Sequence, residues 1–346
     1  MQENSALGQV SDLAAGLAIP IASPTPPRMP PASLRVRVKT SPWLRRLLPT
    51  RLVVRRAVRR GGMIWEQSPK AREDALVAME TIVAETPRAH EVAELAREHL
   101  IESEADRALF WQPWSAPSVD AQSIARLREV LSGDRGVLLS SCHLGPYHRS
   151  MSAFAALGHV PYAVAGPWFF EKPSPDYWGR RIARWWRGSC TRLIRSNGSF
   201  PILRALLEHG ELVFLFFDMP GRHKTRFLGK PATLADGSAR LAVQADALVL
   251  PLRARRAGHR IWVDVAAPID PRDFANVDEL HDALAALHES WILELPAAMA
   301  DPRGFGWAQG ATPEAWVHPN SVDHHRVNHP RPARPGGVQH VIAGNS

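Results

Sequence analysis

The chain has 346 residues, of which 45% are hydrophobic and 22% are charged, a composition typical of globular proteins and not of disordered or fibrous ones. Basic residues outnumber acidic residues by 42 to 34, and the net charge of +8 favours acidic partners such as phospholipid headgroups, an acidic carrier protein or nucleic acid. Two cysteines, Cys142 and Cys190, are too few for a disulfide framework and fit a reducing cytoplasm.

The two ends of the chain differ in composition from its centre. Residues 1–42 contain repeated prolines and predict a flexible arm. The stretch 13–22 is apolar, but it is short, interrupted by Pro20 and not preceded by basic residues, so we expect neither a membrane anchor nor a signal peptide. Residues 312–346 are rich in His, Pro, Arg and Gly and predict a disordered, solvated tail. One domain is therefore expected over residues 43–311.

The domain is predicted to begin with helices and to continue as an alternation of strands and helices. Residues 43–115 are expected to be helical, because 74–83 and 91–102 show helical spacing of apolar residues. Further along, strands are predicted at 136–141, 160–165, 211–217, 247–254 and 260–266. Helices are predicted at 149–157, 176–187, 200–209, 237–245 and 277–294. This order predicts an α/β fold, with a mostly parallel or mixed sheet flanked by helices.

The most informative segment runs from 136 to 154. The apolar run of the first predicted strand is followed by His143, then by a turn at Gly145 and Pro146, and then by a helical stretch. Active sites of α/β proteins lie at the carboxyl ends of strands, and a nearby helix start offers N–H groups to developing negative charge. His143 is therefore the leading candidate for catalysis, the alternative being a buried structural histidine.

Several segments together resemble a known family. The string His143-Leu-Gly-Pro-Tyr-His148 resembles the His-x4-Asp/Glu block of the lysophospholipid acyltransferase superfamily, in its bacterial lipid A biosynthesis acyltransferase branch. Residues 210–220 resemble the family's Gly-Glu strand that ends in Asp218, and 226–233 its Phe-Phe-Gly-x-Pro-Ala block. Residues 237–252 resemble the helix and strand that follow. The pieces occur in family order over about residues 45–310.

The resemblance implies an acyltransferase that moves an acyl group from a thioester, on coenzyme A or acyl carrier protein, to a hydroxyl or amine. His143 would be the general base and Asp218 an acidic residue near the site. Arg195, with backbone N–H groups after His143, would stabilise the oxyanion; Arg192 is a rival for this role. An N-cap or turn residue is the alternative reading of Asp218.

His148 stands where the family has its acid, and an imidazole supplies no negative charge. Another carboxylate, Asp218 or Glu171, can orient His143 instead. Alternatively, a better nucleophile such as an amine or hydroxylamine needs a weaker base, or catalysis has been lost and the fold only binds. A zinc pair formed by His143 and His148 lacks an evident third ligand, so we expect no metal, and the chain contains no P-loop or dinucleotide fingerprint that would predict a cofactor.

Three further features bear on substrates and partners. A basic loop with Arg222, Lys224 and Arg226 is a candidate for binding the phosphate or phosphopantetheine of the donor, or is merely solvated. Cys142 neighbours His143, but adjacent side chains of a strand diverge, so it is a weak nucleophile candidate. Residues 43–60 and 178–195 are rich in arginine and contain no acid, as expected of a surface that meets an acidic carrier protein or an anionic membrane.

The sequence therefore predicts an acyltransferase acting on a lipid, a glycolipid or a specialised metabolite, cytoplasmic or peripheral to the inner face of the membrane. Two alternatives remain open. One is a transferase that uses aminoacyl-tRNA as donor, which rests on charge alone. The other is a non-catalytic relative that binds lipid or a carrier protein. No DNA partner is expected.

Overall fold

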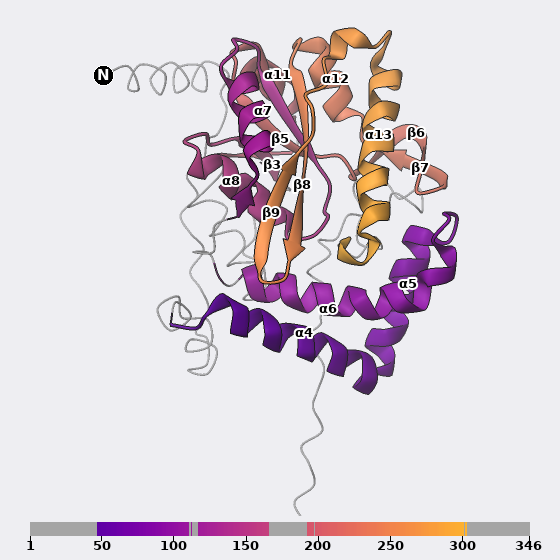
Figure 1. Cartoon of the computed structure of the whole chain (residues 1–346). Coiled ribbons are helices and arrows are strands. Elements are labelled where there is room, and N and C mark those ends of the chain that lie inside the picture. Colours follow the sequence, from indigo (N-terminus) through magenta and orange to yellow (C-terminus); the bar gives the residue numbers. More distant parts are fainter. Residues whose placement is uncertain are drawn as a thin grey trace, which may run out of the picture.

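A seven-stranded sheet forms the centre of the molecule (Figure 1). The computed structural model describes residues 47–110, 112, 117–165, 192–196, 198–300 and 302. In spatial order the strands are β1 (Ser118–Val119), β9 (Arg260–Val265), β8 (Leu248–Ala257), β2 (Val137–Ser141), β5 (Leu212–Phe216), β3 (Tyr162–Ala165) and β4 (Arg192–Arg195). Only β8 and β9 pair antiparallel among the described strands of this sheet. The predicted α/β class with a mostly parallel, mixed sheet is confirmed.

Alternating side chains of the central strands build a hydrophobic core on each face of the sheet. Leu138 and Val213 lie in one core, and Leu139 and Phe214 lie in the other, as a period of two requires. The Leu138 face is covered by α11 (Phe200–Glu208), α12 (Gly237–Gln244) and α13 (Val277–Glu294). The Leu139 face is covered by α7 (Ala121–Leu131) and α8 (Ser150–Ala156). Burial on both faces explains why the strands are apolar runs without polar alternation.

Three long helices precede the sheet, as predicted for residues 43–115: α4 (Thr50–Gln67), α5 (Pro69–Val83) and α6 (Val92–Phe110). Figure 1 shows α4 and α6 side by side below the sheet. Their close approach depends on Gly61, because a Cβ at this position would lie 2.5 Å from the Cα of Ile101. Ser68 caps the next helix by accepting the N–H of Ala71, and Pro69 stands at its first position.

Strands and helices after residue 136 fall close to their predicted positions, with one clear exception. The segment predicted as a basic loop after Asp218 is a strand, β6 (Pro220–Phe227), which forms an antiparallel hairpin with β7 (Lys230–Leu234). Its charged residues alternate with His223 and Thr225, a pattern of an exposed strand that composition alone assigns to a loop. The helix predicted at 176–187 and both predicted terminal segments, 1–42 and 312–346, lie outside the described residues.

No helix in the described part of the chain combines the length and the apolarity that crossing a bilayer requires. This finding concerns the helices between residues 47 and 302 with the gaps given above.

Candidate active site

The register of the central strands brings His143 and Asp218 together. β2 and β5 are parallel neighbours in which Ser141 is paired with Phe216. His143 and Asp218 each follow their member of this pair by two residues, so they leave the sheet side by side at its carboxyl edge. The N–H of Phe217 donates to the carbonyl of Ser141 at 2.7 Å and extends the pairing to the residue before Asp218.

Both oxygens of the Asp218 carboxylate accept hydrogen bonds from His143. Nδ1 of His143 lies 2.9 Å from Oδ1 of Asp218, and the backbone N–H of His143 donates to Oδ2 at 3.0 Å. The aspartate is fully buried and the histidine is 5% exposed. A carboxylate at Nδ1 selects the tautomer with the proton on that nitrogen, so the lone pair of the neutral ring is on Nε2. The arrangement has the same geometry as the histidine–aspartate pair of a catalytic triad.

Aromatic rings and the returning chain fix the orientation of His143. The ring of Phe216 stacks on the imidazole with centroids 3.8 Å apart, and the ring of Tyr147 meets its edge at 4.7 Å. The carbonyl of His143 accepts the N–H of Ala300 at 2.8 Å, and the N–H of Gly145 donates to Ala298 at 2.8 Å. Backbone bonds on both sides of the loop therefore hold the histidine in place.

Gly145 allows the chain to turn directly after His143. Its φ is +59°, and a Cβ there would lie 2.5 Å from the carbonyl oxygen of Ala254. Both the backbone conformation and the lack of space demand glycine. The glycine that marked a turn in the sequence is thus required by the neighbouring strand β8.

His148 does not take the place of the missing acid. Its ring lies edge-on to Phe110 with centroids 4.6 Å apart, while Nδ1 of His143 is bound to Asp218. Burial, and to a smaller extent the charge of Arg149, holds the pKa of His148 well below its usual range, so the ring is neutral at pH 7. Of the carboxylates considered for orienting His143, Asp218 is in contact with it, whereas Glu171 lies outside the described residues.

The two arginines that competed for the oxyanion role lie at opposite ends of β4. Arg195 ends this strand at the same sheet edge as His143, whereas Arg192 begins it and donates to the hydroxyl of Tyr162 at 2.9 Å. β4 is three strands from β2, which corresponds to about 14 Å at about 4.8 Å per strand. Of the two arginines, Arg195 therefore lies at the sheet edge of His143. A substrate that contacts both residues has to span the distance between β2 and β4.

Backbone N–H groups after His143 were expected to stabilise an oxyanion, and the structure disagrees for three of them. Those of Gly145, Tyr147 and Arg149 donate to the carbonyls of Ala298, Gly145 and Pro146. These N–H groups are already used by a 3-10 helix at Tyr147–Arg149 and by an antiparallel contact with residues 298–300. Cys142 is buried in the core, and this burial raises the pKa of its thiol well above the usual value, which disfavours a thiolate nucleophile.

Arg222, Lys224 and Arg226 are exposed and share one face of β6, because residues two apart along a strand point the same way. They lie on the hairpin that begins two residues after Asp218. The opposite face of the same strand presents His223 and Thr225 to α13.

Comparisons with known proteins find similarity among solved structures, at a low level. No protein-family model matches the chain, and no curated protein matches it. Among solved structures, the 1-acyl-sn-glycerophosphate (LPA) acyltransferase PlsC from Thermotoga maritima is similar, with 16% sequence identity and a TM-score of 0.36. The match covers 71% of this chain and 96% of that chain. A similarity this low does not by itself assign an activity.

The structure adds buried polar residues near the site that the sequence did not single out. Ser140 on β2 lies 2.9 Å from Nε2 of His288 on α13, and both are almost fully buried. Arg149, also almost fully buried, donates to the carbonyl of Gln112 at 3.1 Å. Nothing local marks His288, because its partner is 148 residues away in the chain. Arg149, six residues after His143, was visible only as the start of a helix.

Proposed function

We propose that this protein is an acyltransferase in which His143, oriented by Asp218, acts as the general base. The observation that carries the proposal is the paired contact of the Asp218 carboxylate with Nδ1 and the backbone N–H of His143. An imidazole exchanges protons near neutral pH, and a buried carboxylate stabilises the imidazolium that forms when it accepts one. The resemblance of four sequence segments to the lysophospholipid acyltransferases gives the same chemistry.

The reaction that fits this pair is acyl transfer from a thioester. Nε2 of His143 takes the proton of a hydroxyl or amine while the oxygen or nitrogen attacks the thioester carbonyl. The bond from the carbonyl carbon to sulfur then breaks, and the thiolate leaves with the proton from His143. The products are an ester or amide and a free thiol, so no external oxidant or reductant is needed. Arg195 is the proposed partner for negative charge on the substrate or the oxyanion.

The donor is proposed to be acyl carrier protein or coenzyme A. Arg222, Lys224 and Arg226 form an exposed basic face on the hairpin that follows Asp218, suited to a phosphate or to acidic side chains. Lysine and arginine do not distinguish a carrier protein from a nucleotide. The donor assay below separates these two sources, and it includes aminoacyl-tRNA as a third.

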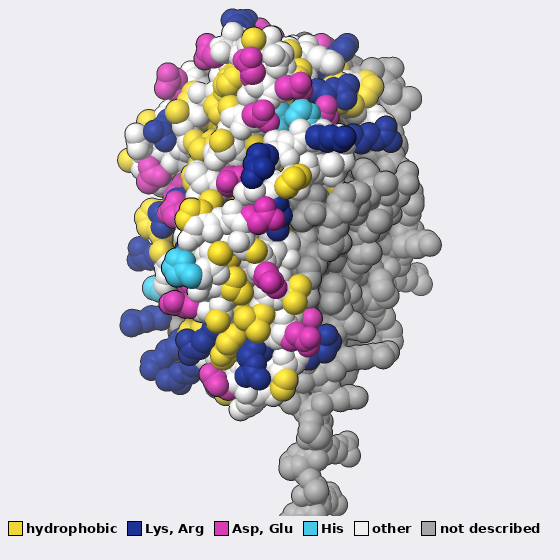
Figure 2. Space-filling view, turned by 90° about the vertical axis from the view of Figure 1, so that its right-hand side faces the viewer, with side chains coloured by type: hydrophobic (Ala, Val, Ile, Leu, Met, Phe, Trp, Pro, Cys, Tyr) yellow, Lys and Arg dark blue, Asp and Glu magenta, His cyan; other side chains and the backbone are white. Residues whose placement is uncertain are grey.

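A second surface supports contact with anionic lipid. Four hydrophobic side chains at and before α4 are 47–77% exposed, namely Leu47, Leu48, Leu52 and Met63. They are interleaved with exposed Arg55, Arg56 and Arg59. Figure 2 shows Lys and Arg side chains gathered at the lower end of the molecule, the end where Figure 1 draws α4, α5 and α6. We propose that this face holds the protein at the inner surface of the membrane, near a lipid acceptor.

The experiment compares wild type with His143→Ala in extracts of the native host and in vitro. We expect an acylated product to disappear in the variant while its precursor accumulates, as measured by untargeted mass spectrometry. Purified protein is then given acyl-CoA, acyl carrier protein or aminoacyl-tRNA, and the rate of transfer is expected to fall by about 10²–10⁴-fold in the variant. If a folded His143→Ala protein leaves product profile and rates unchanged, the catalytic role fails and a binding protein remains.

A further inference from the structure

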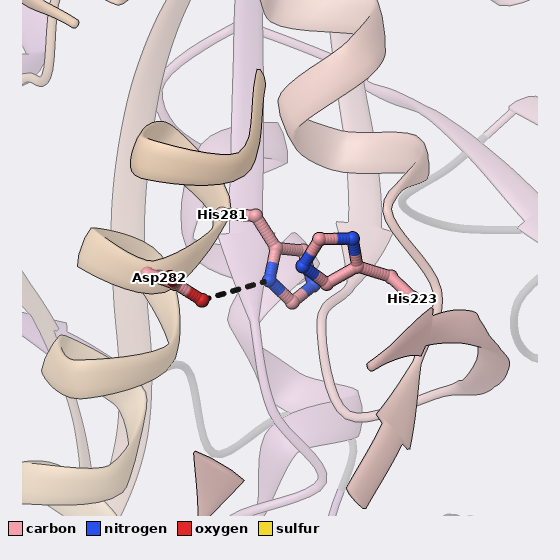
Figure 3. A group of neighbouring side chains, drawn as sticks. All are labelled: His223, His281 and Asp282. Atoms are coloured by element: carbon pink, nitrogen blue, oxygen red, sulfur yellow. Dashed lines mark ion pairs between the residues drawn. The ribbon is translucent and has the colours of Figure 1, made fainter. Parts of the chain in front are cut away.

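A second cluster of titratable side chains lies away from the His143 site, between the β6–β7 hairpin and α13 (Figure 3). Its centre is His281 of α13, whose side chain is completely buried. Within the described residues neither ring nitrogen of His281 has a hydrogen-bond partner. Buried polar atoms nearly always have a hydrogen-bond partner or a ligand, because leaving them without one is unfavourable. Two such atoms on one ring point to a site that binds a ligand.

Donor groups surround this ring. His223 of β6 faces it with ring centroids 4.2 Å apart, and Asp282 follows it on the helix. Nδ1 of His281 and Oδ1 of Asp282 are 3.9 Å apart, too far for a hydrogen bond. One donor atom from each of the three residues can be chosen so that all lie within 4.8 Å of one another. Figure 3 shows the two rings and the carboxylate converging from the hairpin and the helix.

The surroundings orient these groups as a metal site requires. The hydroxyl of Thr225 donates to Oδ1 of Asp282 at 3.0 Å, and Nδ1 of His223 lies 3.6 Å from Oδ1 of Asp278. Asp278, His281 and Asp282 are spaced i, i+3 and i+4 and share one face of α13. Hydrogen bonds from outer residues to ligands are a regular feature of metal sites.

We propose that His223, His281 and Asp282 bind one divalent transition metal ion, zinc in the first place, with water as the fourth ligand. Two imidazoles and a carboxylate suit zinc and are poor for magnesium or calcium, which prefer oxygen ligands. Ligand atoms in tetrahedral zinc sites are about 3.4 Å apart, since each bond is about 2.0–2.2 Å long. The side chain of Asp282, which is 65% exposed, has room for the movement of about 1 Å that this requires.

The position of the site predicts a role in holding the fold together. The ion would join the hairpin, which begins two residues after Asp218, to α13. Phe217, the neighbour of Asp218, packs against His281 and His288 with ring centroids 5.0 Å apart in each case. The metal would therefore cross-link the hairpin and α13 beside the proposed active site, without a part in proton transfer. The proposal does not depend on the proposed acyltransferase activity.

Metal binding by the purified full-length chain tests the proposal. After removal of metal with a chelator, the protein is titrated with Zn²⁺ by calorimetry and with Co²⁺ by visible absorption, and its melting temperature is recorded with and without Zn²⁺. We expect one tight equivalent, a tetrahedral Co²⁺ spectrum and a higher melting temperature. His223→Ala and Asp282→Asn should each weaken this equivalent by more than about tenfold, and Thr225→Val by about tenfold.

The control is His209→Ala, which removes an exposed histidine at the C-cap of α11 and should leave Zn²⁺ binding unchanged. All variants keep the histidines of residues 312–346, so metal bound by these cancels in the comparison. If circular dichroism shows that His223→Ala does not fold, the Zn²⁺ affinity of Asp282→Asn tests the proposal. The side chain of Asp282 is exposed, so we expect this variant to fold. Equal Zn²⁺ affinity and Co²⁺ spectra in wild type, Asp282→Asn and folded His223→Ala would overturn the proposal, as would a wild type that binds no tight equivalent.

Discussion

At the scale of single residues, the contact between Asp218 and His143 is the main feature of the candidate site. Asp218, two residues after the neighbouring strand β5, contributes a buried carboxylate that contacts Nδ1 of His143. His148 keeps a position against Phe110 and stays neutral. A carboxylate at Nδ1 therefore does not require an acid at position 148.

Substitutions of Asp218 and His148 should have different effects on the rate of acyl transfer. In Asp218→Asn the amide cannot stabilise an imidazolium, and we expect the transfer rate to fall by up to about 10⁴-fold with little change in KM. His148→Gln should cost much less, because a neutral ring is replaced by a neutral amide. The measurement is the steady-state rate of acyl transfer by both variants. A larger loss in His148→Gln than in Asp218→Asn would contradict the pairing seen here.

His288 should make stability depend on pH. Burial lowers its pKa to about 4, against a weaker opposite effect of Asp218, whereas the unfolded chain has the ordinary value near 6.5. Between these values the unfolded state binds a proton that the folded state does not. The contribution of His288 to stability is therefore fully present above about pH 6.5 and is lost as the pH falls toward 4. The loss is at most about 3 kcal/mol, since one pKa unit corresponds to about 1.4 kcal/mol.

This window can be measured by urea unfolding of wild type and His288→Gln at a series of pH values from 7 to 4. We expect the variant to have lower stability at pH 7, because the Ser140 contact changes, and a shallower loss toward acid. His209→Gln, at an exposed position, should keep the wild-type slope. Identical slopes in all three proteins would show that His288 is not the group that titrates.

At the scale of helices and strands, two adjacent glycines of α4 have opposite roles. A Cβ on Gly61 would lie 2.5 Å from Ile101 Cα on α6, whereas a Cβ on Gly62 would meet no atom within 4 Å. Gly61→Ala should force the two helices apart and destabilise the protein by at least about 1 kcal/mol. Gly62→Ala should stabilise it by roughly 0.5–1 kcal/mol, because alanine loses less entropy in a helix. Thermal unfolding of the pair checks this, and equal shifts would argue against the α4–α6 contact.

The β6–β7 hairpin shows how an element can carry two surfaces. Alternation along β6 sends Arg222, Lys224 and Arg226 outward and His223 and Thr225 toward α13. One strand thus presents a basic face for the proposed donor and supplies the hairpin's part of the proposed metal site. This division was hidden in the sequence, where all five residues read as one polar run.

At the scale of the whole molecule, the exposed hydrophobic side chains Leu47, Leu48, Leu52 and Met63 lie at and before α4. Figure 1 shows α4 at the opposite end of the molecule from α11 and α12. We expect the protein to sediment with vesicles that contain anionic lipid and to be released as salt screens the arginines. The charge reversal Arg55→Glu/Arg59→Glu should abolish this binding. Arg204→Glu, on α11, should retain it, since this arginine lies on a different surface and pairs with Glu208. Equal vesicle binding by both variants would refute a role of α4.

The sequence by itself determined the α/β class and most strands and helices, because buried parallel strands are short apolar runs and helices repeat every 3.6 residues. It also marked His143 and Asp218, since each follows such a run. Only the tertiary structure decided that the two touch, because contact depends on β2 and β5 being neighbours in a fixed register. It likewise separated Arg195 from Arg192 and joined His223 to His281 across 58 positions. Local patterns specify elements, whereas contacts between distant residues follow from packing that no local pattern encodes.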